Sequence, residues 1–359
     1  MRRCVAIVYN EPVKSRYDER GEQAAVNGIL EAVEAVYDAL IELGYRAVKV
    51  PIAPPLSGAR QTLDALEADL VFNLFEGFAD HPETEVQLAE ILSALGVPFT
   101  GSPPGVLKLA LDKAKTKTIL RGAGINTPDF QLLQPETLSS FRLSYPCIVK
   151  PRRDDASNGL SSESVVYDFA SLEKQVTAVS RSYGGEALVE HFLDGGELNA
   201  TVLGDTVLPV SEIDYSLPEG VPRLLTFAAK WQPDSLYFQG TEVVCPAEIT
   251  DEEREDIAQT VLTVFGLFGC RGYARVDMRR DGAGKLNVIE VNPNPDISPD
   301  AGAARQVQAA GMAYPQFIDK IIKLALEKEE DSDHDTPHAK KGQTISDGTA
   351  ARPARVQTD

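Results

Sequence analysis

Apolar residues in the first hundred positions alternate between short continuous runs and stretches with helical spacing. Residues 4–10 form an apolar run typical of a buried strand, and apolar side chains recur every three or four positions over residues 29–43, which predicts one face of a helix. The remaining runs predict strands at 46–50, 69–75 and 97–100, a short helix after the first of these and a helix at 84–95. This alternation predicts a parallel sheet covered by helices, an N-terminal α/β domain over residues 1–101.

The pattern changes after Gly101-Ser102-Pro103-Pro104-Gly105, a segment that favours a break between domains. A helix is expected at 106–121, where Gly122 and Gly124 end it. A small α+β lobe is expected over residues 102–189, with strands at 132–133, 147–150, 164–167 and 187–190 and a helix at 171–183.

A larger α+β lobe is expected over residues 190–326. Its pattern predicts strands at 198–203 and 242–244, a helix at 251–268, a hairpin at 273–292 and a last helix at 314–326. Residues 327–359 carry almost no large apolar side chain, so they cannot bury enough surface to offset the entropy of ordering. We expect this last segment to be a disordered tail.

Composition and charge exclude several classes of protein. The 359 residues are enough for two or three domains. A formal net charge of −19 argues against a nucleic-acid partner, because phosphate binding draws on clustered Lys and Arg. No apolar stretch approaches the roughly 20 residues of a membrane-spanning helix, and the first apolar run is short for the core of a signal peptide. We therefore expect a cytoplasmic protein that does not bind membranes.

The segment from Tyr273 to Asn292 is the most informative part of the chain, because Asp281-Gly282 between two apolar runs predicts a hairpin. A two-residue loop would set Asp277 opposite Val288, and a four-residue loop would set it opposite Glu290. With either loop, alternation places Arg275, Asp277, Glu290 and Asn292 on one face and Asn287 on the other. A register shifted by one residue would break this set, since it turns every side chain of a strand to the other face.

Two carboxylates and an amide oxygen on one face, from Asp277, Glu290 and Asn292, are the hard ligands that Mg²⁺ prefers. Arg275 beside them could neutralise charge that develops in a reaction. The alternative is an ordinary solvated polar face. Against that alternative, Val288, Ile289 and Val291 make the second strand apolar on both faces, so that an acid between them is not simply exposed.

Three lysines stand out by their context, although each alone is compatible with an ordinary surface lysine. Lys150 ends the apolar run Cys147-Ile148-Val149 and precedes a loop of small, turn-prone residues at 152–159 that could bring backbone N–H groups close to phosphates. Lys113 follows Leu111-Asp112 in a helical region, and Lys230 lies in an otherwise apolar stretch.

Together these segments resemble the ATP-grasp superfamily, and most closely its D-alanine:D-alanine ligase family, from about residue 69 to residue 326. The resemblance implies a two-lobed ATP-grasp fold after the N-terminal α/β domain. It assigns nucleotide binding to Lys113, to Lys150 in Ile148-Val149-Lys150-Pro151, to Glu190 and Leu193 in the segment 188–193, to Glu197 and to Lys230. It assigns metal binding to Asp277, Glu290 and Asn292, and catalysis to Arg275, Lys230 and Ser157.

The resemblance also implies a reaction. Such enzymes use ATP and Mg²⁺, or Mn²⁺ in its place, to convert a small-molecule carboxylate into an acyl phosphate, which an amine then attacks. A homodimer is compatible with the family. Two alternatives stay open at this point: an ATP-dependent small-molecule kinase, and a nucleotide-binding protein without turnover.

Departures from the family pattern concentrate on substrate recognition. The turn after the first strand reads Tyr9-Asn10-Glu11-Pro12-Val13-Lys14 and has no glycine pair. The family's His-Gly motif is replaced by residues 75–80, and its run of serines is reduced to Ser157 before Gly159. After Asn292 the chain continues with residues 293–296, Pro-Asn-Pro-Asp, instead of leading to a glycine. The sequence therefore predicts an intact ATP site and a substrate other than D-alanine.

Overall fold

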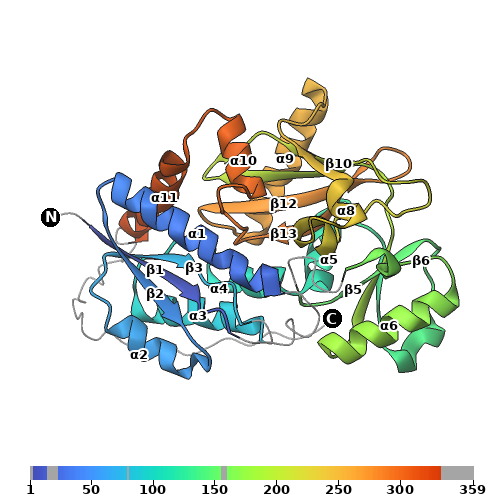
Figure 1. Ribbon diagram of the computed structural model, residues 1–359, viewed down its shortest axis with the longest axis horizontal. Helices are drawn as coiled ribbons and strands as arrows, with labels where there is room; N and C mark the ends of the chain where they lie inside the picture. Colours follow the sequence, from blue (N-terminus) through green and yellow to red (C-terminus); the bar gives the residue numbers. More distant parts are fainter. Residues whose placement is uncertain (1–2, 14–22, 79–80, 155–159, 333–359) are drawn as a thin grey trace, which may run out of the picture.

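The computed structural model describes residues 3–13, 23–78, 81–154 and 160–332, which form three sheets with helices packed on them (Figure 1). The first sheet has the order β2-β1-β3, and all its pairs are parallel, as predicted. Its strands are β1 (Cys4–Asn10), β2 (Arg46–Ile52) and β3 (Leu70–Leu74). The strand expected at 97–100 is wrong: only Phe99 forms a single bridge, to Val71. Pro98 next to it has no N–H with which to extend the ladder.

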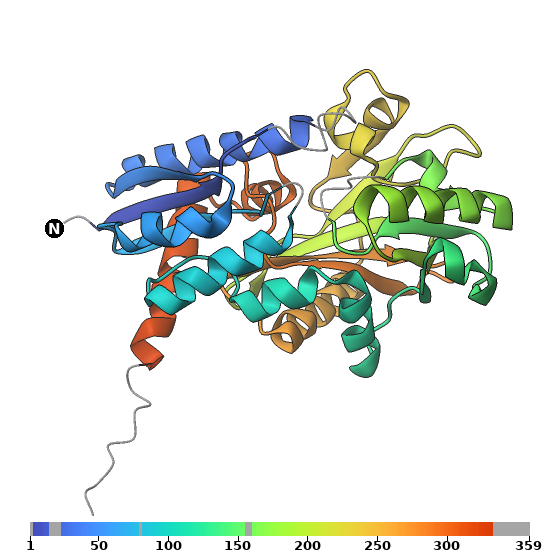
Figure 2. The ribbon, with the colours of Figure 1, turned by 90° about the horizontal axis from the view of Figure 1, so that it is seen from below.

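Helices cover both faces of this sheet. Their bounds are α1 (Gln23–Glu42), α2 (Ala59–Asp64) with a 3₁₀ turn at Leu56–Gly58 before it, and α3 (Glu83–Leu95). The last helix, α11 (Tyr314–Ser332), packs beside α1 on the same face (Figures 1 and 2). Phe317 and Ile321 of α11 are buried in one cluster with Val33, Leu40 and Phe72. The last helix, which we expected within the large lobe, therefore completes the core of the N-terminal sheet.

The helix α11 also continues past the position where we expected the disordered tail to begin, residue 327. Residues 327–332 include Glu and Lys, which are good helix formers, so nothing in their composition ends the helix at Leu326. The rest of the expected tail, residues 333–359, lies outside the described residues.

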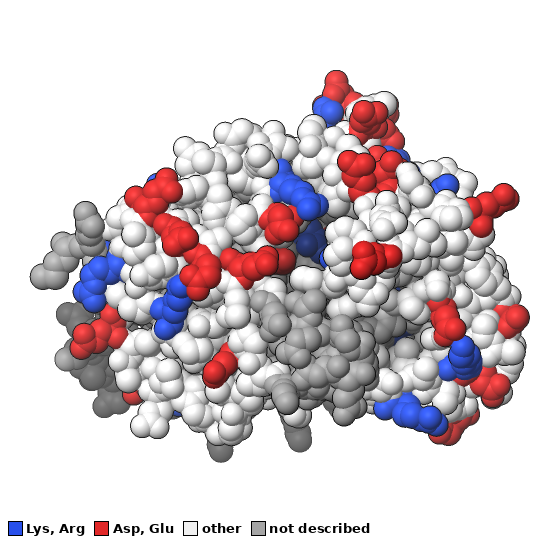
Figure 3. Space-filling model, in the orientation of Figure 1, with Lys and Arg blue, Asp and Glu red and all other residues white. Residues whose placement is uncertain are grey.

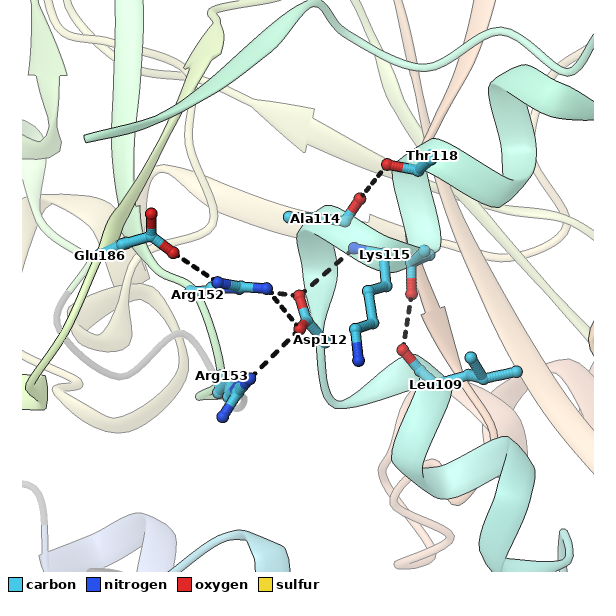
Figure 4. Close-up of polar contacts among 9 residues, drawn as sticks. Leu109, Asp112, Ala114, Lys115, Thr118, Arg152, Arg153 and Glu186 are labelled. Carbon is cyan, nitrogen blue, oxygen red and sulfur yellow. Dashed lines mark hydrogen bonds and ion pairs between the residues drawn. The ribbon is translucent and has the colours of Figure 1, made fainter.

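The helix expected at 106–121 is two helices, α4 (Pro104–Ala110) and α5 (Lys113–Gly122). Asp112 interrupts it with an extended backbone and caps α5, since its carboxylate accepts a hydrogen bond from the Lys115 N–H at 3.3 Å. The same carboxylate accepts two hydrogen bonds from Arg152, from Nε at 2.9 Å and from Nη2 at 2.7 Å (Figure 4). Because of this break, Lys113 is the first residue of a helix.

The second sheet has the order β4-β7-β5-β6 and forms the small lobe. Its strands are β4 (Phe130–Leu133), β5 (Cys147–Pro151), β6 (Val165–Val166) and β7 (Ala187–His191), with 3₁₀ turns at Pro135–Ser140 and Ser162–Ser164. Helix α6 (Phe169–Tyr183) covers one face, where its Leu172 and Val176 pack against Val149 and Val189. The other face looks toward the rest of the molecule (Figure 1).

The third sheet has the order β11-β10-β8-β12-β13, with β9 paired to β8. Its strands are β8 (Glu197–Leu203), β9 (Thr206–Val207), β10 (Ser211–Tyr215), β11 (Thr241–Val244), β12 (Tyr273–Arg280) and β13 (Leu286–Asn292). Helix α9 (Asp251–Phe268) closes one face with Ile257, Val261 and Val264. The short elements β9, β10, α7 (Phe227–Trp231), α8 (Leu236–Gln239) and α10 (Gly302–Ala309) were not predicted. Over the described ranges, no helix has both the length and the apolar character needed to cross a bilayer.

We predict that Asp112→Ala will lower the free energy of unfolding by about 1–3 kcal/mol at pH 7, because it removes a helix cap and leaves Arg152 without its partner. Burial raises the pKa of Asp112, but hydrogen bonds from Arg152 and Lys115 outweigh it and hold this pKa below its ordinary value. The contribution should therefore be constant from pH 7 to about pH 5 and be lost only as the pH falls through the lowered pKa.

Urea denaturation of both proteins at several pH values measures this difference. The control is Asp129→Ala, because the Asp129 side chain is 78% exposed in its pair with Arg121 and should matter little. Equal losses in the two variants would contradict a special role for Asp112.

Candidate active site

A cavity of about 840 Å³ is enclosed by all three sheets and their loops. Most of the residues singled out in the sequence line it: Lys150, Glu190, Leu193, Glu197, Lys230, Arg275, Asp277, Glu290 and Asn292. Lys113 reaches the same site, since its Nζ lies 2.7 Å from Oε1 of Glu290. Ser157 lies outside the described residues.

The hairpin between β12 and β13 has neither of the two loop lengths that we considered. Asp281 and Lys285 pair across a three-residue loop, through an N–H···O bond of 2.9 Å, and Gly284 takes the positive φ of +79° that this loop needs. Continued along the strands, that register would set Asp277 opposite Ile289. The register shifts by one between Asp277 and Met278, so that Asp277 faces Glu290 instead. A β-bulge at Ile289 thus restores the acidic pair.

The bulge also corrects our placement of Asn287. Asn287 pairs with Arg279, and directly paired residues share a face of the sheet. Arg279 lines the cavity, whereas Met278 and Val288 lie in the core on the other side. Asn287 is therefore on the same face as Asp277, because the bulge places two residues of β13 opposite one residue of β12.

The two carboxylates of the hairpin are neutralised by neighbouring donors. Arg275 donates to both oxygens of Asp277, from Nε at 2.7 Å and from Nη2 at 2.9 Å, and Asn292 Nδ2 donates to Oδ2 at 3.0 Å. Burial raises the pKa of Glu290, but the charge and hydrogen bond of Lys113 outweigh burial and lower it. Burial would lower the pKa of Arg275, and Asp277 more than reverses this, so that the pKa rises. Glu290 and Arg275 are thus both charged at neutral pH.

No group of three or more His, Cys, Asp or Glu side chains suited to a metal occurs in the described part of the chain. The opposed pair Asp277 and Glu290, with the amide of Asn292, fits an ion that needs one or two carboxylates and takes its other ligands from water and phosphate. This is the donor set of Mg²⁺ rather than of zinc, which favours His and Cys.

Glu190 of β7 also lines the cavity, where it lies between two lysines. Its Oε1 is 2.8 Å from Lys117 Nζ, and its Oε2 is 2.9 Å from Lys150 Nζ. Glu190 is 1% exposed, and although burial raises its pKa, the two lysines outweigh burial and lower it. For Lys117, burial prevails over Glu190 and lowers the pKa. The carboxylate is thus held in place from both sides.

Lys117 is the residue whose importance the sequence did not reveal. It is 0% exposed, and besides Glu190 its ammonium donates to Thr127 Oγ1 at 3.1 Å and to the carbonyl of Ile289 at 3.3 Å. Ile289 is the bulged residue of the hairpin. One ammonium therefore joins Glu190 to the backbone that sets Asp277 opposite Glu290. The available signal was its position one helical turn after Lys113, in a helix with a buried face.

Glu197 belongs to a second polar cluster in the cavity wall. Its Oε2 accepts a hydrogen bond from the Tyr215 hydroxyl at 2.8 Å and lies 3.6 Å from Arg279 Nη1. Arg279 Nε also donates to the carbonyl of Gly195 at 3.1 Å. Burial and then the charge of Glu197 raise the pKa of Tyr215 well above its ordinary value, so its hydroxyl stays a donor.

Lys230 comes from the short helix α7, which Thr226 caps by accepting from the Ala229 N–H at 3.1 Å. Next to it, the ring of Trp231 lies against Gly28 of α1, so closely that a Cβ at Gly28 would be 2.9 Å from the ring. Removal from bulk water, and then the charge of Arg275, lower the pKa of Lys230. The segment with α7 therefore spans the cavity and touches the N-terminal part of the chain.

Described residues of three segments that depart from the family pattern line the cavity: Asn10, residues 76–78 and residues 293–296. Asn294 accepts from the Tyr273 hydroxyl at 3.2 Å and donates to Glu85 Oε1 at 3.1 Å, which ties the loop after β13 to α3. Asn10, from the end of β1, accepts from the Glu76 N–H at 3.2 Å. All of them except Tyr273 line the cavity. These altered residues thus share one cavity with Asp277 and Glu290.

We predict that Lys117→Met will lower the free energy of unfolding by about 3–5 kcal/mol, because it removes one partner of a buried ion pair and the donor to the bulge. Urea denaturation followed by circular dichroism measures it. The control, Lys174→Met on α6, removes a lysine that pairs at the surface with Glu163 and is 66% exposed, so it should change little. A wild-type stability for Lys117→Met would contradict the structural role of this ammonium.

Similar proteins were found by sequence and by structure. A protein family described as the D-ala D-ala ligase C-terminus matches residues 119–323. A protein named D-alanine–D-alanine ligase from Xanthomonas axonopodis pv. citri is 32% identical over 298 residues, which cover 81% of this chain and 88% of the relative. An uncharacterized protein from Sinorhizobium fredii is 34% identical over 269 residues, 73% of this chain and 76% of that protein.

Two solved structures share the fold. The D-alanine–D-alanine ligase from Bacillus anthracis complexed with ATP has a TM-score of 0.72 at 21% identity, covering 92% of this chain and 99% of that one. The VanG D-Ala:D-Ser ligase from Enterococcus faecalis has a TM-score of 0.68 at 19% identity, covering 90% and 100%. These similarities confirm the predicted fold class, an N-terminal parallel α/β domain followed by a two-lobed ATP-grasp fold. The chain belongs to the D-alanine–D-alanine ligase family and is an ATP-dependent enzyme of the ATP-grasp type.

Proposed function

We propose that this enzyme is a carboxylate–amine ligase that uses ATP and Mg²⁺, forms an amide bond through an acyl phosphate and releases ADP. The observation that carries the proposal is the pair Asp277 and Glu290, opposed across the hairpin in the same cavity as Lys150 and Glu190. A similar structure is described as complexed with ATP, which supports the nucleotide. A cytoplasmic location and domain boundaries near residues 101 and 189 are part of the same proposal.

The nucleotide would lie along the cavity from Glu190 to the hairpin. We assign the adenine to the segment with Glu190 and Leu193 and the ribose to Glu197. The phosphates would take Lys113, Lys150 and Lys230. Lys113 and Lys150 are paired with Glu290 and Glu190, so nucleotide binding would exchange these partners for phosphate oxygens. Charge-assisted hydrogen bonds of this kind are stronger than neutral ones.

Asp277, Glu290 and Asn292 would hold Mg²⁺, and Mn²⁺ suits the same oxygen donors. When bound, such an ion neutralises charge on the phosphates and on the phosphoryl group that is transferred. Arg275 would then stabilise the oxyanion that forms when the amine attacks the acyl phosphate, since its guanidinium is already fixed against Asp277. Lys230 would neutralise the transferred phosphoryl group. The catalytic role of Ser157 rests on the family resemblance alone.

Water must be kept away from an acyl phosphate, which it would hydrolyse. The segment with α7 already reaches across the cavity to α1 through Trp231 and Gly28. This contact supports a lid that excludes water while the amine attacks. A kinase that stops at phosphoryl transfer differs in its product, which mass spectrometry of the reaction mixture would identify as an acyl phosphate or its hydrolysis product instead of an amide.

We predict that Glu290→Gln, which keeps the volume but removes one negative charge, will lower turnover by a factor on the order of 10² or more. The metal concentration needed for half-maximal ADP release should rise, because one carboxylate ligand is lost. Coupled ADP assays over a range of Mg²⁺ concentrations measure both effects.

A matched control is Glu136→Gln, since Glu136 is exposed in the small lobe and does not line the cavity. It should behave as the wild type. If Glu290→Gln kept normal activity and an unchanged Mg²⁺ requirement, the hairpin would be only a scaffold, and the proposed metal site would be wrong.

We also predict that D-alanine alone will support little or no ADP release, because residues of the segments that depart from the family line the same cavity as the acidic pair. Their residues, such as Asn10, Glu76 and Asn294, are already engaged with one another or with Glu85. ADP release and product analysis with D-alanine at physiological concentration test this. Efficient D-alanyl-D-alanine synthesis would contradict it.

A further inference from the structure

One buried arginine of the cavity wall, Arg279, connects several separate segments of the chain. It belongs to β12 and is paired with Glu197 of β8 across the sheet. Its Nε donates to the carbonyl of Gly195, at 3.1 Å, in the segment between β7 and β8. Its Nη2 donates to the carbonyl of Arg223 in the loop between β10 and α7, and its Nη1 lies 3.6 Å from Oε2 of Glu197. Each nitrogen of the guanidinium thus has a partner on a different segment.

Aromatic rings and backbone enclose the same guanidinium. Its central carbon lies 5.2 Å from the centre of the Phe192 ring and 5.9 Å from that of the Tyr215 ring, both within the range of cation–π contacts. The segment between β7 and β8 approaches β12 so closely that a Cβ at Gly195 would collide with the carbonyl of Arg280. The position of the Arg279 guanidinium is therefore fixed by contacts on several sides.

The carboxylate of Glu197 uses one of its two oxygens for contacts within the described ranges. Oε2 accepts a hydrogen bond from the Tyr215 hydroxyl at 2.8 Å and also lies near Arg279. Oε1 accepts no hydrogen bond from any residue that the structure describes, although Glu197 lines the cavity. One oxygen is thus held by donors of the protein, and the other is available to a donor in the cavity. A hydroxyl group of a bound molecule is such a donor.

Burial distinguishes this ion pair from the pairs at the molecular surface. On the face shown in Figure 3, basic side chains lie next to acidic ones at several places, where water reaches both partners. Exposed pairs of this kind contribute little. The side chains of Arg279 and Glu197 are only 5% and 12% exposed, so the loss of one partner would leave the other as a largely buried, unbalanced charge.

The register of β12 relates this pair to the acids of the hairpin. Asp277 and Arg279 are two residues apart on β12, so they share a face and are separated by roughly 7 Å along the strand. The opposed pairs Asp277–Glu290 and Arg279–Glu197 therefore follow one another on the cavity face of the sheet. This spacing suits a ligand that has hydroxyl groups at one end and phosphates at the other.

We propose that Arg279 is a positioning residue for nucleotide binding: together with Tyr215 it holds Oε2 of Glu197, so that Oε1 accepts a hydrogen bond from a ribose hydroxyl. This inference rests on the proposed function, which assigns the ribose to Glu197. The triphosphate brings several negative charges into the cavity, and an unbalanced carboxylate would repel them. Arg279 neutralises that charge and leaves Oε1 free to act as an acceptor.

The test measures nucleotide binding to the full-length enzyme by isothermal titration calorimetry, so it does not require the other substrates to be known. The nucleotides are ATP, 2′-deoxy-ATP and 3′-deoxy-ATP, each with Mg²⁺. The wild type should bind ATP about 10- to 150-fold more tightly than the analogue that lacks the bonded hydroxyl, the range expected for a hydrogen bond to a charged group.

Arg279→Met removes the guanidinium and should weaken the binding of all three nucleotides, because the charge of Glu197 is no longer balanced. ATP should lose most, so that its Kd and those of the analogues come to within about threefold of one another, since a misaligned hydrogen bond contributes little. Tyr215→Phe removes the other donor to Oε2 and should reduce the preference for ATP in the same direction. The control Arg254→Met removes an exposed arginine of α9 that pairs with Asp251, and it should leave every Kd unchanged.

A double mutant separates a positioning role from a merely structural one. Glu197→Ala alone should abolish the preference for ATP over its analogues. Adding Arg279→Met to Glu197→Ala should then leave the ratio of the Kd values unchanged, because the side chain through which Arg279 acts is absent. This ratio does not depend on the fraction of folded protein, since all three nucleotides titrate the same folded molecules.

The outcomes separate two failures. If the wild type bound no ATP, or bound ATP and both analogues equally well, the nucleotide assignment of the proposed function would fall, and the role of Arg279 with it. If the wild type preferred ATP and Arg279→Met kept that preference, the proposed function would stand and the role of Arg279 would be overturned. Should Arg279→Met fail to fold, a full preference for ATP in Tyr215→Phe would overturn the proposed holding of Oε2 in the same way.

Discussion

The arrangement of the site depends on one buried cation. The Lys117 ammonium, with no exposed surface, lies between the carboxylate of Glu190 and the carbonyl of Ile289. A charge so far from water is stable only with well-placed partners, so it constrains every group that it touches. Those groups belong to β7 of the small lobe and to the bulge of β13 in the large sheet. The ammonium of a single side chain therefore ties the small lobe to the hairpin of the large sheet.

The acidic side chains near this cation are paired with basic side chains of the same protein. Although the net charge of the chain is −19, the acids at the centre of the cavity are paired: Glu190 with two lysines, Glu290 with Lys113, and Asp277 with Arg275. The charges of these side chains thus neutralise one another within the cavity. Under the proposed function, phosphates would take over the lysines while a divalent cation takes over the carboxylates. Because positive and negative charge are exchanged together, the site could bind nucleotide and metal jointly more easily than either alone.

The regular parts of this fold could be predicted because their signals are local. The bounds of β1 and α9 follow from apolar spacing and from caps within a few residues. The predictions were wrong where the end of an element or the face of a side chain depends on residues far away in the sequence. The break at Asp112 depends on Arg152, which lies 40 residues away, and the position of Asn287 depends on a bulge that the loop sequence does not encode. The prediction that Arg275, Asp277, Glu290 and Asn292 share one face was correct, but it did not include the bulge. With the three-residue loop and no bulge, Asp277 and Glu290 would lie on opposite faces.

The same distinction explains why the ATP half of the site was visible in the sequence and the acceptor half was not. Phosphates and metal ions bind particular kinds of atoms, and regular strands place the side chains that bear these atoms at fixed spacing. The spacing of Asp277, Glu290 and Asn292 therefore indicates a metal site in the sequence itself. The segments that depart from the family pattern instead lie mostly in loops, where no regular spacing indicates which side chains come together. Asn294, for example, is bonded to Tyr273 and to Glu85, which lie 21 and 209 residues away in the sequence. Contacts between residues so far apart in the sequence follow from the folded structure, and the pattern of the sequence alone does not predict them.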